Sequence, residues 1–309
     1  MRWVALFSGQ GGQRTDHIAR MSAMLAPDLR AAWNQALADA GSTVERLDDE
    51  AELTRNRVAQ PTLCAWQLGA WRMLSAALPS PALVAGYSVG EIAAGGAAGG
   101  YAADEAVRLA ALRAGLMDAA IDFPAGLAAV IGLAVHELEP LCAREGVAVA
   151  IRNGVRHFIV GGPEPALESF IAAALAAGAV RAHRLGVTTP AHTHWLAPAS
   201  SAFAVALQSR MAAGRLRLAM LSGIDARTLR TATEAAVALA RQISTPLDWL
   251  ACMEAIVETQ PDAVLEIGPG NALARMLAEM TAGVAVRALD DFRDPAAAIG
   301  WINRQRRTS

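Results

Sequence analysis

The chain has 309 residues, of which 54% are hydrophobic and 18% charged, so it can bury a sizeable core and wholesale disorder is excluded. Its 27 basic and 29 acidic residues leave a formal net charge of −2, which argues against a nucleic-acid-binding surface as its main function. No lysine occurs in the chain, which excludes a Schiff-base or catalytic lysine.

The first 125 residues alternate short apolar runs with helical periodicity. In chain order the expected elements are a strand at 4–7, helices over 15–79 that begin at Pro27 and Pro61, a strand at 81–85, and an Ala-rich helix over 91–121 interrupted near 95–100. Strands that alternate with helices in this way predict an α/β fold, with a parallel sheet covered by helices on both faces.

A different rhythm occupies residues 126–190. The expected elements are a strand at 127–131, a helix at 136–144, strands at 147–151 and 158–160, a helix at 163–177 and a strand at 180–185. The order βαββαβ is the ferredoxin-like unit, so this segment is predicted to be an insertion between 1–125 and 191–309. Later strands are expected at 219–222 and 263–267, and the last runs into the turn Gly268-Pro-Gly-Asn271.

The cysteines and the lengths of the apolar segments indicate the cellular compartment of the protein. Cys64, Cys142 and Cys252 are widely spaced and odd in number, so we interpret them as buried small hydrophobic residues in a reducing compartment, with no metal-ligand spacing. The N-terminal apolar run is too short for a signal peptide, and no apolar stretch reaches about 18 residues. We expect a soluble, cytoplasmic, monomeric protein that neither spans a membrane nor binds a metal.

Gly86-Tyr-Ser-Val-Gly90 has the nucleophile-elbow pattern, in which a serine between glycines occupies a sharp turn from strand to helix. The apolar run before it and the Ala-rich helix after it favour that reading over a structural Gly-rich turn. Ser88 is then a candidate nucleophile, and the main-chain N–H of Val89 points to where an oxyanion would form.

A serine nucleophile needs a base, and the chain has six histidines. His192 and His194 follow a turn that contains Pro190, and spacing alone leaves both open. Gln10 lies on a Gly-rich loop after the first strand. This loop lacks the G-x-G-x-x-G spacing of dinucleotide sites, so a main-chain N–H from it is the candidate second oxyanion donor.

Six motifs in order resemble those of the malonyl-CoA:acyl carrier protein transacylases, over about residues 3–280. They are Phe7-Ser-Gly-Gln-Gly-Gly-Gln13, Gln60-Pro61, Gly86-Tyr-Ser-Val-Gly-Glu91, Leu112-Arg113, Pro190-Ala-His192 and Glu266-Ile-Gly-Pro-Gly270. The resemblance implies an α/β-hydrolase-like core with a ferredoxin-like insertion. It also implies transfer of a malonyl group from malonyl-CoA, the donor substrate, to the thiol of an acyl carrier protein by a ping-pong mechanism without a bound cofactor.

The resemblance assigns roles to particular residues. It implies that Ser88 is the acylated nucleophile and His192 its base, that the N–H groups of Gln10 and Val89 form the oxyanion hole, and that Arg113 pairs with the malonyl carboxylate. Gln60 and Ala191 are further pocket candidates, and small Ala191 leaves room beside the acyl α-carbon. In the family a main-chain carbonyl orients the imidazole, and Asp248 falls at that position, so its carbonyl or its carboxylate is the candidate orienter.

Two departures and two alternatives accompany the resemblance. Tyr87 stands where the family usually has histidine, and Ser8 where it has proline. These departures suggest a dedicated branch, such as the malonyl-transfer subunit of a malonate decarboxylase or a transacylase that serves a biosynthetic cluster, rather than the housekeeping fatty-acid enzyme. The first alternative is an ordinary serine hydrolase, which usually needs a late histidine, whereas none follows His194. The second is a non-catalytic docking subunit, which the presence of Ser88, His192 and Arg113 together disfavours.

Overall fold

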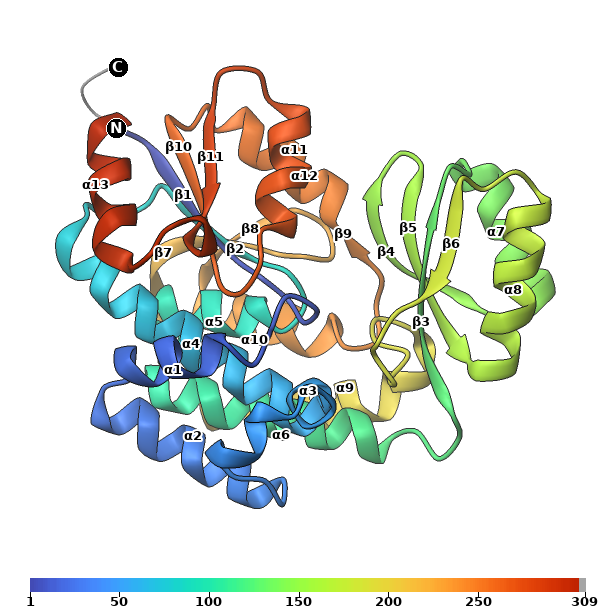
Figure 1. Cartoon of the computed structure of the whole chain (residues 1–309), viewed down its shortest axis with the longest axis horizontal. Coiled ribbons are helices and arrows are strands. Elements are labelled where there is room, and N and C mark those ends of the chain that lie inside the picture. Colours follow the sequence, from blue (N-terminus) through green and yellow to red (C-terminus); the bar gives the residue numbers. More distant parts are fainter. Residues whose placement is uncertain (306–309) are drawn as a thin grey trace.

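Two β-sheets organise the α/β fold of residues 1–305, which the computed structural model describes (Figure 1). The larger sheet has the strand order β11-β10-β1-β2-β7-β8. Its strands are β1 (Trp3–Phe7), β2 (Leu83–Gly86), β7 (Arg215–Leu221), β8 (Thr228–Thr231), β10 (Ala263–Ile267) and β11 (Ala285–Ala288).

The centre of the larger sheet consists of short apolar strands that are buried along their whole length. Every residue of β1, β2 and β10 is buried, and these strands pair in parallel, as expected for sheets covered on both faces. The predicted parallel sheet has one exception, at an edge, where β8 pairs antiparallel with β7. An antiparallel edge strand on an otherwise parallel sheet is a common variation.

The helical stretches predicted in the first 125 residues are divided into more and shorter helices than the sequence suggests. They are α1 (His17–Met24), α2 (Pro27–Asp39), η1 (Val44–Asp48), α3 (Glu50–Thr54), α4 (Asn56–Ala77), α5 (Gly90–Ala97) and α6 (Ala103–Ala119). Pro27 begins α2 as predicted, but Pro61 lies inside α4 and does not begin it. Proline removes one backbone donor there, and the extensive buried surface of this 22-residue helix outweighs that loss.

The smaller sheet has the order β6-β3-β5-β4-β9. Its strands and the two helices beside it are β3 (Ala125–Ile131), α7 (Val135–Glu145), β4 (Ala148–Gly154), β5 (His157–Pro163), α8 (Glu164–Ala176), β6 (Arg181–Arg184) and β9 (Leu247–Asp248). Alternate residues of β3 face opposite sides: Ala128 and Val130 pack with α7 and α8, while Leu127 and Ala129 join the main core.

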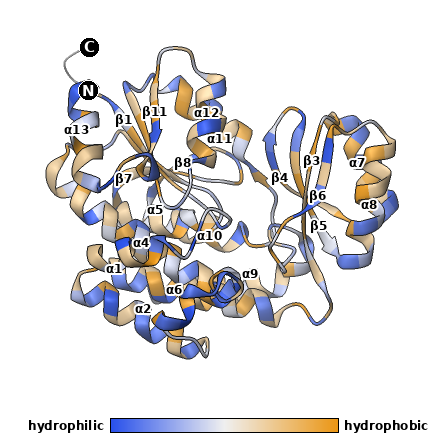
Figure 2. Cartoon of the chain, in the orientation of Figure 1, coloured by the Kyte–Doolittle hydropathy of each residue, from blue (hydrophilic) through white to orange (hydrophobic). Residues whose placement is uncertain are grey.

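The rest of the chain returns to the larger sheet. Its helices are η2 (His194–Leu196), α9 (Ala197–Gln208), α10 (Ala232–Arg241), α11 (Trp249–Glu258), α12 (Ala272–Met280), η3 (Leu289–Asp291) and α13 (Pro295–Gln305). Hydrophobic and hydrophilic residues alternate along most of the helices, as expected of helices with one face on the core (Figure 2). Over residues 1–305 no helix is long and apolar enough to cross a membrane. All three cysteines are buried and unpaired, as predicted.

The carboxyl ends of three neighbouring strands bring three glycine-containing turns together. β1 leads into residues 8–14, which we call the first glycine loop, and β10 leads into residues 268–271, the second glycine loop. β2 leads into the elbow at 86–90. A cavity of about 650 Å³ lies here, lined by both glycine loops, the elbow, the smaller sheet and α12. Ligands of open α/β sheets bind at this end of the strands.

Candidate active site

Ser88 occupies a strained turn between β2 and α5. Its φ of +55° lies in the left-handed region, which a non-glycine residue adopts rarely and mostly where function requires it. The flanking glycines allow the close approach that this turn needs. A Cβ on Gly86 would lie 2.2 Å from the backbone of Gly90 and Glu91, and one on Gly90 would lie 2.2 Å from the carbonyl oxygen of Phe7. The sequence pattern therefore corresponds to a real elbow.

His192 faces Ser88 across the site. Its Nε2 lies 2.8 Å from Ser88 Oγ, and its Nδ1 lies 2.5 Å from the main-chain carbonyl oxygen of Gln242. Because a carbonyl oxygen can only accept a hydrogen bond, Nδ1 carries the proton and Nε2 is free to accept from the serine hydroxyl. Burial, with a further contribution from nearby Arg113, lowers the pKa of His192 to about 3, so the ring is neutral near pH 7.

Arg113 places a positive charge in the buried interior of the site. It comes from α6 and is only 1% exposed, which excludes the alternative of an ordinary surface arginine. Its guanidinium donates to Gln60 Oε1 at 2.8 Å, to Gln242 Oε1 at 2.8 Å and to Ser88 Oγ at 3.4 Å. Burial lowers its pKa to about 10, so it still carries its charge at pH 7. Within residues 1–305 it forms no ion pair, and its Nε has no hydrogen-bond partner.

Two polar residues that sequence reasoning did not select connect these groups. The amide of Gln242 donates to the carbonyl oxygen of Ser88 at 3.0 Å and to Glu91 Oε2 at 2.8 Å. Glu91 is fully buried in the first turn of α5 and accepts from the N–H of Gly223 at 3.3 Å. A carboxylate in a helix that is otherwise Ala, Gly and Ile is a signal that could have identified Glu91. Gln242 lies at the end of α10 with no pattern around it to mark it.

Asp248 does not orient His192, so that prediction is wrong. The imidazole is held by the carbonyl of Gln242, and the main-chain N–H of His192 donates to the carbonyl oxygen of Ile243 at 2.9 Å. The carboxylate of Asp248 instead caps α11 by accepting from the N–H of Ala251 at 3.0 Å, and it pairs with Arg152 at 3.3 Å. An aspartate that precedes a helix finds its nearest donors in that helix.

The remaining predicted residues lie around this centre. Gln60 contacts Arg113, as described above, and Ala191 is buried directly before His192. Val89 is buried at the N-terminal end of α5, where main-chain N–H groups point out of the helix. Gln10 lines the cavity from the first glycine loop, beside Tyr87 of the elbow. The oxyanion roles of Gln10 and Val89 stay predictions.

The buried carboxyl of Glu91 makes stability depend on pH. Burial raises its pKa from 4.5 to about 7, against the opposing hydrogen bond from Gln242. The folded chain therefore binds more protons than the unfolded chain between these pH values, and the Glu91 contribution to the free energy of unfolding falls as pH rises through that window. We expect Glu91→Gln to gain stability relative to the unmodified chain between pH 5 and pH 8, measured by urea unfolding. A difference that does not change with pH would contradict this.

Comparison with known proteins agrees with this geometry. Residues 4–302 match the acyl transferase domain family. The chain is 33% identical over 301 residues to the malonyl CoA-acyl carrier protein transacylase of Mycobacterium tuberculosis, covering 94% of this chain and 97% of that protein. It is 28% identical over 307 residues to the Escherichia coli protein of the same name, with 96% and 99% covered.

Solved structures give the same answer. The chain aligns with a TM-score of 0.86 and 27% identity to a malonyl-transacylase in complex with a type II PKS acyl-carrier protein, covering 97% of this chain and 99% of that one. It aligns with a TM-score of 0.81 and 32% identity to the MCAT of Mycobacterium tuberculosis, covering 96% and 98%. The family resemblance of the six motifs is thereby confirmed. With the match extending over nearly its whole length, the chain belongs to the acyl transferase domain family.

Proposed function

We propose that the protein transfers a malonyl group from malonyl-CoA to the phosphopantetheine thiol of an acyl carrier protein through an ester on Ser88. The relatives named malonyl CoA-acyl carrier protein transacylase and the related complex with an acyl-carrier protein support this. The first half-reaction draws on Ser88 and His192. His192 Nε2 takes the hydroxyl proton, Ser88 Oγ attacks the thioester carbon, and the proton passes to the sulfur of CoA as the carbon–sulfur bond breaks.

The oxyanion formed in that attack needs donors that are already in place. The N–H groups of Val89 and Gln10 are the proposed donors, one from the start of α5 and one from the first glycine loop. In the second half-reaction the thiol of the carrier gives its proton to His192, and its sulfur attacks the ester. The proton then returns to Ser88 Oγ, which restores the enzyme. The carbonyl of Gln242 holds the ring in the tautomer that both steps require.

The buried guanidinium of Arg113 is the observation that carries the choice of acyl group. It lies 3.4 Å from Ser88 Oγ, and its hydrogen-bond partners are all neutral. The carboxyl of Glu91 acts on it only from beyond the amide of Gln242, so it is a buried cation without an anion in contact. Removing a charge from water is costly unless a partner compensates it. An acyl group that ends in a carboxylate supplies that partner with two oxygens in the geometry that a guanidinium prefers. We infer that malonyl is favoured over acetyl for this reason.

We also propose the finer description of the fold. Residues 1–125 and 191–305, the described part of the predicted range 191–309, form an α/β-hydrolase-like catalytic core, and residues 126–190 form a ferredoxin-like insertion. The insertion is supported by its element order and by the sheet order β6-β3-β5-β4, in which the first and third strands are central. Strand β9 of the core extends the sheet of the insertion by pairing in parallel with β4.

Intact-mass measurement tests the proposed function. Mixed with malonyl-CoA, the protein is expected to gain one malonyl group, carried by the peptide that contains residues 86–90. The adduct should persist in buffer and disappear when an acyl carrier protein with its phosphopantetheine thiol is added, because only a thiol completes the reaction. Rapid release of free malonate without a carrier would identify a serine hydrolase instead. Absence of any adduct would identify a non-catalytic docking subunit.

A further inference from the structure

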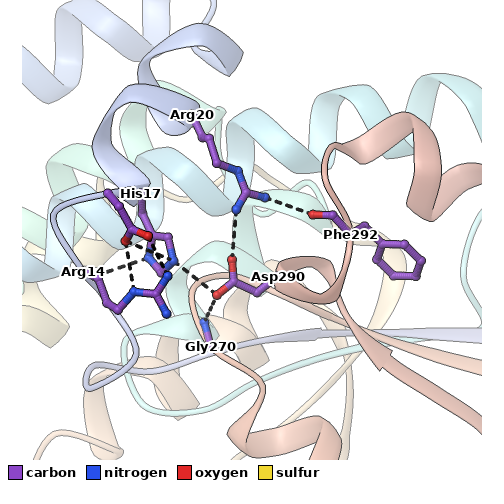
Figure 3. A network of polar contacts seen from close by, with 7 residues as sticks. Arg14, His17, Arg20, Gly270, Asp290 and Phe292 are labelled. Carbon is purple, nitrogen blue, oxygen red and sulfur yellow. Dashed lines mark hydrogen bonds and ion pairs between the residues drawn. The ribbon is translucent and has the colours of Figure 1, made fainter.

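A buried histidine fixes the C-terminal end of the first glycine loop. His17, the first residue of α1, is 1% exposed, and its Nδ1 accepts a hydrogen bond from the main-chain N–H of Arg14 at 3.3 Å. Its Nε2 therefore carries the proton and lies 3.3 Å from Asp290 Oδ2, within ion-pair distance but outside hydrogen-bond geometry (Figure 3). The edge of the Trp66 ring system packs against the imidazole, with ring centroids 4.9 Å apart. These contacts leave the ring little freedom to rotate.

Asp290 carries the connection to the second glycine loop. Its Oδ2 also accepts the N–H of Gly270 at 2.9 Å, and its Oδ1 lies 3.4 Å from a guanidinium nitrogen of Arg20 (Figure 3). Burial opposes ionisation of this carboxyl, but the neighbouring imidazole of His17 and the hydrogen bond from Gly270 outweigh it and hold its pKa below the ordinary value. Asp290 is therefore an acceptor around neutral pH, with donors from α1 and from the second glycine loop.

The two glycine loops are in tight contact. A Cβ on Gly12 would lie 2.4 Å from the carbonyl oxygen of Pro269, so the loops touch backbone to backbone. The N-terminal end of the first glycine loop is anchored separately. There the N–H of Ser8 donates to the carbonyl oxygen of Ile267, and the side-chain amide of Gln67 donates to the carbonyl oxygen of Ser8. Gln10 lies between this anchor at Ser8 and the C-terminal anchor at Arg14. The position of its main-chain N–H consequently depends on both.

We propose that His17 and Asp290 are positioning residues that hold the first glycine loop against the second and thereby place the main-chain N–H of Gln10 for the oxyanion. The inference rests on the proposed function, in which Gln10 supplies one of two oxyanion donors. Neither side chain lines the cavity that Gln10 and Tyr87 of the elbow line, so both act through the loop. An oxyanion donor must be fixed before the reaction, because a loop that reorganises during the reaction loses the stabilisation.

This role predicts a loss of rate rather than of binding. Removing an oxyanion donor costs about a hundredfold or more in rate, and a displaced donor loses part of that. We therefore expect Asp290→Asn to lower the saturating rate of Ser88 acylation by about tenfold or more, because the neutral amide loses the ion pair with Arg20 and presents an N–H donor to at least one of the three groups that now face the carboxylate, His17, Arg20 and Gly270. The malonyl-CoA concentration for half-maximal rate should stay within about twofold, since ground-state contacts are unchanged.

Single-turnover acylation, followed by quenching and intact-mass measurement, tests the proposal with two further variants. His17→Gln keeps an N–H for Asp290 but not the ring, so it is expected to retain more activity than His17→Ala. Asp28→Asn is the matched control, because it makes the same chemical change in an ion pair with Arg72 that lies on α2 and α4, away from the cavity. It should acylate at the rate of the unmodified chain.

The final adduct level separates positioning from folding. A slower rate with one malonyl group per chain supports the proposal. If Asp290→Asn and His17→Ala acylate at the rate of the unmodified chain, the proposal is overturned. It is also overturned if their final adduct level falls while the chains that do react do so at the unmodified rate, because His17 and Asp290 then have a structural role only. If the unmodified chain itself acquires no malonyl group, the proposed function fails first, and the inference that depends on it fails with it.

Discussion

His192→Ala is expected to lower the rate of Ser88 acylation by malonyl-CoA by about 10⁴-fold, the loss typical of a serine enzyme without a working base. The imidazole Nε2 lies 2.8 Å from Ser88 Oγ, and the pKa of about 3 keeps the ring in its unprotonated, basic form at neutral pH. Without it, the hydroxyl proton has no acceptor of suitable strength when the oxygen attacks. The measurement is the single-turnover rate of malonyl ester formation at saturating malonyl-CoA.

Two further variants serve as controls in this experiment. His194→Ala should acylate like the unmodified chain, because His194 is exposed on η2 with its ring against Trp195. Ser88→Ala should carry no malonyl ester at all. A large loss in His194→Ala together with normal acylation by His192→Ala would reverse the assignment of the base. The unfolding midpoint of His192→Ala is measured in parallel, because truncating a buried ring also leaves a cavity.

The parts of the site that sequence predicts are those with a local pattern. Strands β1, β2 and β10 were expected at 4–7, 81–85 and 263–267, because strands buried on both faces are short continuous apolar runs. The elbow around Ser88 has glycines at fixed spacing for a steric reason that holds in any chain of this fold. Such features depend on residues that are neighbours in the sequence, so a local sequence pattern can predict them.

Features that depend on distant residues were missed or misplaced. Gln242 joins Arg113, 129 residues away, to the carbonyl of Ser88, 154 residues away, and no local spacing encodes either contact. The family resemblance implies that a main-chain carbonyl orients His192, but every residue possesses one, so sequence alone pointed to Asp248 where the structure has Gln242. Strands β8, β9 and β11, which have two to four residues each, are too short to show a period.

Arg113→Ala is expected to change the choice of acyl group rather than the general rate. If Arg113 pairs with the malonyl carboxylate as proposed, that carboxylate gains a bidentate partner, whereas an acetyl group leaves the buried guanidinium without one. Breaking a buried, hydrogen-bonded charge pair costs about 2–5 kcal/mol, so malonyl transfer should fall by well over tenfold. The same change removes the unpaired charge that disfavours acetyl-CoA, so acetyl transfer should hold steady or improve.

The ratio of kcat/KM for malonyl-CoA over acetyl-CoA is the decisive measurement, because other effects of the substitution cancel in it. Loss of the guanidinium also leaves Gln60 Oε1 and Gln242 Oε1 without their donor, and any resulting disorder slows both substrates alike. Arg108→Ala is the matched control, since Arg108 lies on the same helix, is exposed and pairs with Asp104. It should leave the ratio unchanged. An unchanged ratio in Arg113→Ala would mean that another group holds the carboxylate, and that the guanidinium serves only to position Gln60 and Gln242.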